Sequence, residues 1–222
     1  MTTTRWTGRA VSAVALCMIC AMQSNAQTDW RLRLIDDKGL DDPSNAGASR
    51  FTEHGEYFFL GTWNTQLGAK IYRSKDGESW ERISEGGLDG DADSFAVVGF
   101  TWYGDYLYVG NWNQKDGGSM FRAKADLLDP SDIHWEKITA DGFGNPRNWG
   151  FTHMRAFNGY LYAGCFNFIE GSEVFRSETG DPGTWKMVIP KAWGSKVNTD
   201  STMMLVHDGY LYLGPECARD AK

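Results

Sequence analysis

One short phrase, an aromatic strand that ends on glycine, occurs four times in this chain and constrains its fold more than any other feature. The four copies run 57–61, 106–110, 160–164 and 210–214, and the third reads Tyr-Leu-Tyr-Ala-Gly. The closing glycines are spaced 49, 54 and 50 residues apart. A fixed period of this size indicates a chain built from one repeated supersecondary unit.

Each complete repeat contains four strand-like runs. In the third, residues 151–157 lead into Asn158-Gly159, a strong hairpin signal, and residues 160–164 return from it. Residues 173–177 and a strand that begins at Trp185 follow. No segment has sustained helical spacing of apolar residues, so almost no helix is expected. Four short antiparallel strands per unit predict the blades of an all-β β-propeller, and a β-sandwich is the alternative fold.

The repeats also predict the domain organisation. We expect three complete four-stranded blades plus an incomplete fourth, since no third or fourth strand follows residues 210–214. Residues 28–35 match the last strand of a repeat and could complete the final blade. Two interpretations stay open: a truncated arc of a larger propeller, or a four-bladed ring closed by the Trp30 strand. The predicted blades are residues 45–84, 93–139 and 148–189, with a partial blade at 198–214.

The N-terminus predicts export. Residues 1–26 combine Arg5 and Arg9, an apolar stretch from 10 to 22, and a small-residue cleavage site at Ala26. The protein is therefore expected to be secreted or periplasmic, with no membrane span after cleavage of this signal peptide. Cys165 and Cys217 would remain, and whether they pair is left open. The formal net charge of −7 and the lack of a basic cluster exclude nucleic acid as a partner.

The third strands lead into turns with a recognisable pattern. The first reads Arg-Ser-Lys-Asp-Gly-Glu-Ser-Trp from Arg73 to Trp80, and the third is an elongated version from Arg176 to Trp185. This pattern resembles the Asp-box of bacterial neuraminidase repeats, found in sialidase-type β-propellers. The resemblance implies a structural turn in which Asp76 bonds the hairpin backbone and Trp80 packs between strands. Structural roles are expected for eight repeat residues: Asp76, Trp80, Trp135, Trp185, Gly61, Gly110, Gly164 and Gly214.

The same resemblance raises an enzyme hypothesis. Sialidases use clustered arginines, a Tyr/Glu nucleophile pair and an acidic residue, and bidentate guanidinium groups suit a carboxylate ligand. Here Arg73, Arg122 and Arg176 repeat at one strand position, which favours structural ion pairs, and Arg50, Arg147 and Arg155 form no recognisable set. Catalytic residues are therefore not assigned. The favoured function is a secreted binding or interaction module rather than an enzyme; the alternative is a sialidase-like glycoside hydrolase, or an inactive fragment of one.

Two loops carry the candidate binding residues. Asn145, Arg147, Asn148 and Trp149 mix amide, guanidinium and aromatic groups, as sugar and peptide sites do, so a carbohydrate or protein ligand is expected there. Aromatic-Asn pairs at 63–64, 112–113 and 166–167 can stand on one face, although turn formation explains them as well. Asp89, Asp91 and Asp93 resemble the start of a calcium loop but lack its glycine and its final glutamate, so no cofactor is expected beyond this weak calcium candidate.

Overall fold

The computed structural model describes residues 36, 38–124, 133–189 and 191–217. The expected signal peptide and the expected strand at 28–35 lie outside this part of the chain. The structure consists of fourteen strands and short 3-10 turns. The strands are β1 (Gly47–His54), β2 (Tyr57–Trp63), β3 (Ile71–Ser74), β4 (Glu81–Arg82), β5 (Ala96–Tyr103), β6 (Tyr106–Trp112), β7 (Met120–Lys124), β8 (Glu136–Lys137), β9 (Gly150–Phe157), β10 (Tyr160–Phe166), β11 (Val174–Ser177), β12 (Lys186–Ile189), β13 (Asn198–His207) and β14 (Tyr210–Cys217).

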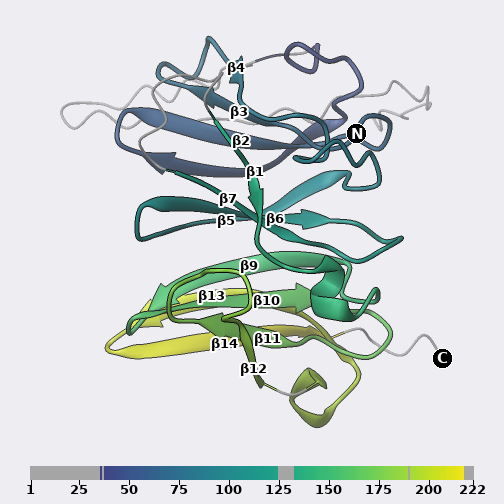
Figure 1. Ribbon diagram of the computed structural model, residues 1–222, viewed down its shortest axis with the longest axis vertical. Coiled ribbons are helices and arrows are strands. Elements are labelled where there is room, and N and C mark those ends of the chain that lie inside the picture. The colour runs from purple at the N-terminus through teal and green to yellow at the C-terminus, as the bar shows by residue number, and fades with distance from the viewer. Residues whose placement is uncertain (1–35, 37, 125–132, 190, 218–222) are drawn as a thin grey trace, which may run out of the picture.

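The strands group into three four-stranded antiparallel blades and one hairpin. Blade 1 is β1–β4, blade 2 is β5–β8, blade 3 is β9–β12, and the β13–β14 hairpin follows. The units follow one another from the purple end of the ribbon to the yellow end (Figure 1). The first strands of successive units, β1, β5, β9 and β13, pack beside one another and form the inner side of the arc. This arrangement confirms the predicted partial β-propeller, and the described ranges contain no α-helix.

Tight turns join the first two strands of every unit. Gly104 has φ of 56° and Asn158, at the corresponding place in blade 3, has φ of 47°. A left-handed backbone is unstrained for glycine and tolerated by asparagine. The sequence Asn158-Gly159 therefore sets the register in which Tyr160 pairs with Phe157.

The hydrophobic cores lie between blades rather than within one. One cluster joins Phe59 and Ile71 of blade 1 to Val97 and Phe121 of blade 2. A second cluster joins blade 2 to blade 3 in the same way. Because a single sheet cannot bury both faces, each blade depends on its neighbours for its core.

The last unit covers the residues of the partial blade expected at 198–214 and runs three residues further. Its two strands pair from Asn198 to Cys217. Cys165 and Cys217 are both free thiols. Cys165 is buried and accepts a hydrogen bond from the Glu173 amide, whereas the exposed Cys217 donates to Asn198. Burial also raises the pKa of the Cys165 thiol well above its usual range, so this thiol is unreactive.

No helix in the described ranges is long and apolar enough to cross a membrane.

Candidate functional site

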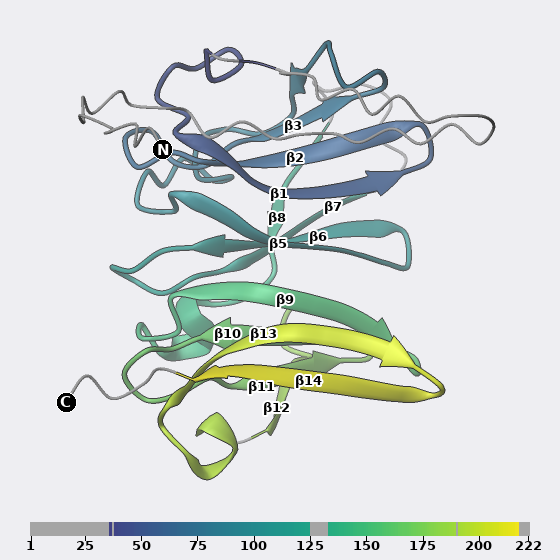
Figure 2. The same ribbon diagram turned by 180° about the vertical axis from the view of Figure 1, so that it is seen from behind.

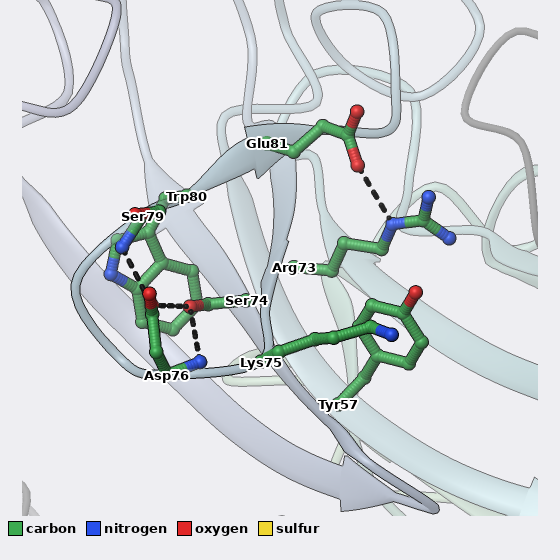
Figure 3. A pocket seen from close by; sticks show the side chains of 8 residues that line it. All are labelled: Tyr57, Arg73, Ser74, Lys75, Asp76, Ser79, Trp80 and Glu81. Atoms are coloured by element: carbon green, nitrogen blue, oxygen red, sulfur yellow. Dashed lines mark hydrogen bonds and ion pairs between the residues drawn. The ribbon is translucent and has the colours of Figure 1, made fainter.

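The turn that resembles an Asp-box closes blade 1 (Figure 3). Asp76 Oδ1 accepts hydrogen bonds from the backbone amides of Glu78 and Ser79, each at 2.8 Å, and from Ser74 Oγ at 3.0 Å. These bonds lower the pKa of Asp76 to about 2. Asp76 Oδ1 therefore holds the turn together, which is a structural role.

Figure 3 also shows the pocket of about 310 Å³ beside this turn, where Arg73 and Lys75 lie near Tyr57. The Arg73 guanidinium carbon is 4.9 Å from the centre of the Tyr57 ring, and Arg73 also pairs with Glu81. Arg122 repeats this arrangement with Tyr106 and Glu136, and Arg176 lies 4.5 Å from the ring of Tyr160. Arg122 also pairs with Asp181 of blade 3 at 2.7 Å and so links two blades. The three repeated arginines thus have structural partners in the propeller and do not converge on one site.

A row of aromatic side chains crosses one end of the propeller. Trp63, Trp112 and Phe166 end the second strands of three blades, and Trp63 and Trp112 pair with the first residue of the next inner strand. The ring centres of Trp112 and Phe166 are 4.7 Å apart. Trp149 also stacks on Phe166, with 5.9 Å between the ring centres. We call the following set the aromatic row: Trp63, Phe95, Trp112, Trp149, Phe166 and Phe168.

The aromatic row is partly open to solvent. Trp63 is 42% exposed and Phe168 is 56% exposed. At Gly150 a Cβ atom would lie 2.8 Å from the Trp112 ring, so this glycine is needed for the indole to lie over β9. The row consists of two groups of contacting rings, the pair Trp63–Phe95 and the set Trp112, Trp149, Phe166 and Phe168. Exposed apolar surface of this kind makes the row a candidate binding surface.

A buried asparagine follows the last aromatic residue of the second strand in each blade and holds the loop that comes after it. Asn113 follows Trp112, and its Oδ1 accepts hydrogen bonds from the amides of Lys115 and Asp116 while its Nδ2 donates to Asp91. Asn64 and Asn167 likewise accept hydrogen bonds from two loop amides in blades 1 and 3. Their Nδ2 groups donate to Asp42 and to Asn148. All three side chains are almost completely buried. The asparagines of the aromatic-Asn pairs are therefore turn-forming residues.

Replacing Asn113 with alanine is expected to lower the free energy of unfolding by about 2 kcal/mol, because two loop amides lose their acceptor. Chemical denaturation of the purified protein measures this change. Asp116→Ala, in the same loop, is the matched control and should be nearly neutral, since its backbone amide rather than its side chain makes the bond. Equal losses for the two variants would contradict this role of Asn113.

Two carboxylates lie at the same end of the propeller, on the hairpin. Asp200 and Glu216 are cross-strand partners. Asp200 is only 6% exposed and accepts a 2.6 Å hydrogen bond from Thr152 Oγ1 of blade 3. The pKa of Asp200 is raised to about 6, mainly by burial and to a smaller extent by the charge of Glu216. Hydrogen bonds from Thr152 and the Ser201 amide, and the charge of Arg50, oppose this shift. Glu216 is exposed and stands two residues after Gly214, where the earlier repeats have Trp63, Trp112 and Phe166.

Basic groups continue this site along the inner strands. Arg50 Nε donates to the carbonyl of Val98 at 2.9 Å, and Arg155 donates to the carbonyl of Met204 at 3.3 Å. Each arginine therefore braces the inner strand of the next unit. His153 lies on β9, and burial lowers its pKa to about 4, with the charges of Arg50 and Arg155 adding to the shift. We call this group the axial site: Arg50, Thr152, His153, Arg155, Asp200 and Glu216.

The loop predicted to bind a ligand contributes one residue to the aromatic row. Trp149 stacks on Phe166, as described above, whereas Asn148 is fully buried and donates to Glu173 and to the carbonyl of Gly142. Asn145 donates to Glu170 and accepts from the Arg147 amide. The side chains of Asn145 and Asn148 therefore hold the loop and its neighbours together, and the Arg147 side chain lies 4.0 Å from Glu170.

The weak calcium candidate has structural contacts of its own. Asp91 accepts from Asn113 and Ser94, Asp93 pairs with Lys115, and Asp89 pairs with Lys137. In the part of the chain that the structure describes, no group of three or more His, Cys, Asp or Glu residues is placed to hold a metal ion.

Sequence reasoning did not identify Asp200 or Glu216. The signal that could have found them is a departure from the repeat. Asp200 occupies the position of Gly150 one repeat later, 50 residues along the chain, and Glu216 occupies the position of the aromatic residue Phe166. A repeat position that changes from small or aromatic to acidic carries more functional information than the positions that stay the same.

The fold and the axial site together define a β-propeller protein with a polar inner side and an aromatic rim. No protein-family model and no curated protein sequence matches the chain. Among solved structures it is similar to a GH43B protein of a Bacteroides ovatus xyloglucan locus, with 17% identity, a TM-score of 0.46, and 75% of this chain and 34% of that chain covered.

Two further solved structures are similar at the same level. A GH32 β-fructofuranosidase of Bombyx mori has 14% identity and a TM-score of 0.44, with 82% of this chain and 44% of that chain covered. A bifunctional GH43-CE protein of Bacteroides eggerthii has 16% identity and a TM-score of 0.45, with 86% and 31% covered. The chain spans less than half the length of each of these proteins.

Proposed function

We propose that this protein binds carbohydrate at the aromatic row and the adjacent axial site. The observation that carries the proposal is the set of partly exposed aromatic rings at this end of the propeller, from Trp63 to Phe168, together with the Asp200–Glu216 pair on the hairpin. Sugar rings present flat CH faces that pack on aromatic rings, and their hydroxyl groups need acceptors and donors at the border. Carboxylates, guanidinium groups and Thr152 supply both kinds of partner here.

Hydrolysis of a glycosidic bond is the second candidate, and the state of Asp200 favours it. A carboxyl group whose pKa is raised to about 6 keeps its proton in weakly acidic solution and can donate it there to a leaving oxygen. Glycoside hydrolases combine such an acid with a second carboxylate, and Glu216 is the nearest candidate on the partner strand. Arg50 and Arg155 would suit an acidic sugar, which is the form a sialidase-like activity would take.

Export fits the same proposal. Polysaccharides lie outside the cytoplasm, and residues 1–26 have the composition of a secretory signal peptide. We infer a secreted or periplasmic location, and N-terminal sequencing of the protein from a cell envelope fraction would test it.

Trp63→Ala is expected to weaken binding of an oligosaccharide by about tenfold or more, because this large indole is 42% exposed and offers its face to a sugar ring. A glycan array of neutral and acidic oligosaccharides would identify the ligand, and calorimetry would measure its affinity. Phe51→Ala is the matched control, since Phe51 is 38% exposed but contacts Trp80, outside the row.

The same protein separates the two candidates. Turnover of chromogenic aryl glycosides that is lost in both Asp200→Asn and Glu216→Gln would establish hydrolysis. Binding without turnover would establish a binding module. If the array shows no bound glycan even at millimolar concentrations of immobilised sugar, the carbohydrate proposal is wrong.

A further inference from the structure

One face of each propeller unit is built to receive another unit. This face carries the first, third and fifth residues of the repeated aromatic phrase. The fifth residue is the closing glycine, and it is where the next unit comes closest. A Cβ atom at Gly61 would lie 2.4 Å from Val97 of blade 2, and one at Gly164 would lie 2.3 Å from Ser201 of the hairpin. At Gly110 the clash would be with Phe151 of blade 3. The glycine therefore leaves a notch into which the next unit fits.

The β13–β14 hairpin presents the same face, but to solvent. Met203 is 66%, Leu205 58%, Tyr210 67% and Tyr212 53% exposed. The opposite face packs on blade 3, where Met204 is 6% exposed. Figure 2 shows this yellow hairpin at the C-terminal end of the arc, beside blade 3. The exposed face carries four large apolar side chains and continues an interface that is already made three times in the molecule.

The register of the hairpin makes this face complementary to itself. Leu205 pairs with Tyr212 at its centre, Met203 with Gly214 on one side, and His207 with Tyr210 on the other. A two-fold axis that crosses the strands at the central pair would place Tyr210 of one copy over the Gly214 notch of the other. The same axis would bring the two Tyr212 rings together and set Met203 against His207.

We propose that two copies of this chain pair through the exposed faces of their β13–β14 hairpins. The contact is a sheet-on-sheet packing in which apolar side chains interdigitate, as they do between blades. It is isologous and therefore closes at two copies. Histidine and acidic side chains lie only at the two ends of this face: His207 and Asp208 at the tip of the hairpin, and the exposed Glu216 two residues beyond Gly214. The central pair, Leu205 and Tyr212, carries no charge.

Analytical ultracentrifugation of the purified protein over a range of concentrations tests the proposal. We expect twice the monomer mass at high concentration and reversible dissociation on dilution. Leu205→Asp should raise the dissociation constant at least about tenfold, because it places a charge at the centre of the interface. Gly214→Val should also weaken the dimer, since it fills the notch for Tyr210. Met187→Asp is the matched control, because Met187 is 49% exposed on the distant outer strand β12.

The outcomes separate the occupants of this face. A dimer that Leu205→Asp and Gly214→Val weaken and Met187→Asp leaves unchanged supports the proposal. A monomer at every concentration overturns it. A dimer that neither hairpin variant affects also overturns the proposal. An open series of larger species overturns it as well, because it would indicate that the hairpin face of one copy binds a different segment of the next copy.

Discussion

Gly110→Ala is expected to destabilise the protein by roughly 3 kcal/mol or more, although it adds a single methyl group. A Cβ atom at this position would lie 2.1 Å from the carbonyl oxygen of Phe151 and 2.9 Å from its Cβ. The first contact is with backbone, which cannot rotate away as the end of a side chain can. Blades 2 and 3 would have to separate locally, and the core between them contains Tyr108, Met120 and Phe151.

Denaturant titration monitored by tryptophan fluorescence measures the loss. The control is Gly104→Asn, at the tight turn between β5 and β6. Gly104 has φ of 56° and no atom within 4 Å of an added Cβ, and blade 3 has Asn158 at the corresponding position. This variant should lie within about 0.5 kcal/mol of the wild type. A Gly110→Ala protein as stable as the Gly104→Asn protein would show that the blades are not packed as closely as described.

These two glycines show how much of the fold the sequence could predict. Hairpin turns, strand alternation and the period are local signals, so the blades could be assigned from residues alone. The requirement for glycine at position 110 could not be predicted in this way, because it depends on the carbonyl oxygen of Phe151 in another blade. The repeat identified the position as structural, and the structure supplies the atom that makes it so.

The axial site shows the opposite limit. Arg50 and Arg155 were visible as residues, but their link to His153 requires the inner strands to lie side by side. Asp200 looks like an ordinary loop carboxylate in the sequence. Its raised pKa comes from its burial on β13, where its side chain lies against Thr152 of blade 3. Burial and long-range charge depend on tertiary packing, so a sequence pattern does not encode them at the residue concerned.

The axial site should also give the protein two opposing responses to pH. Asp200 has a pKa of about 6 when folded and about 4 when unfolded, so its contribution to stability is complete below pH 4 and is lost as the pH rises through 6. His153 has a pKa of about 4 when folded and about 6.5 when unfolded. Its contribution is complete above pH 6.5 and is lost as the pH falls through 4. In the wild type the two changes largely cancel.

Single substitutions should therefore reveal opposite slopes between pH 4 and 6.5. Relative to the wild type, Asp200→Asn should gain up to about 3 kcal/mol in its free energy of unfolding as the pH rises, because only His153 still titrates in this window. His153→Gln should lose a similar amount, because only Asp200 remains. Denaturant titrations at half-unit pH steps measure both slopes, and the double variant should again follow the wild type. Parallel pH profiles for the two single variants would contradict the burial of these groups, and with it the assignment of Asp200 as an acid that keeps its proton up to about pH 6.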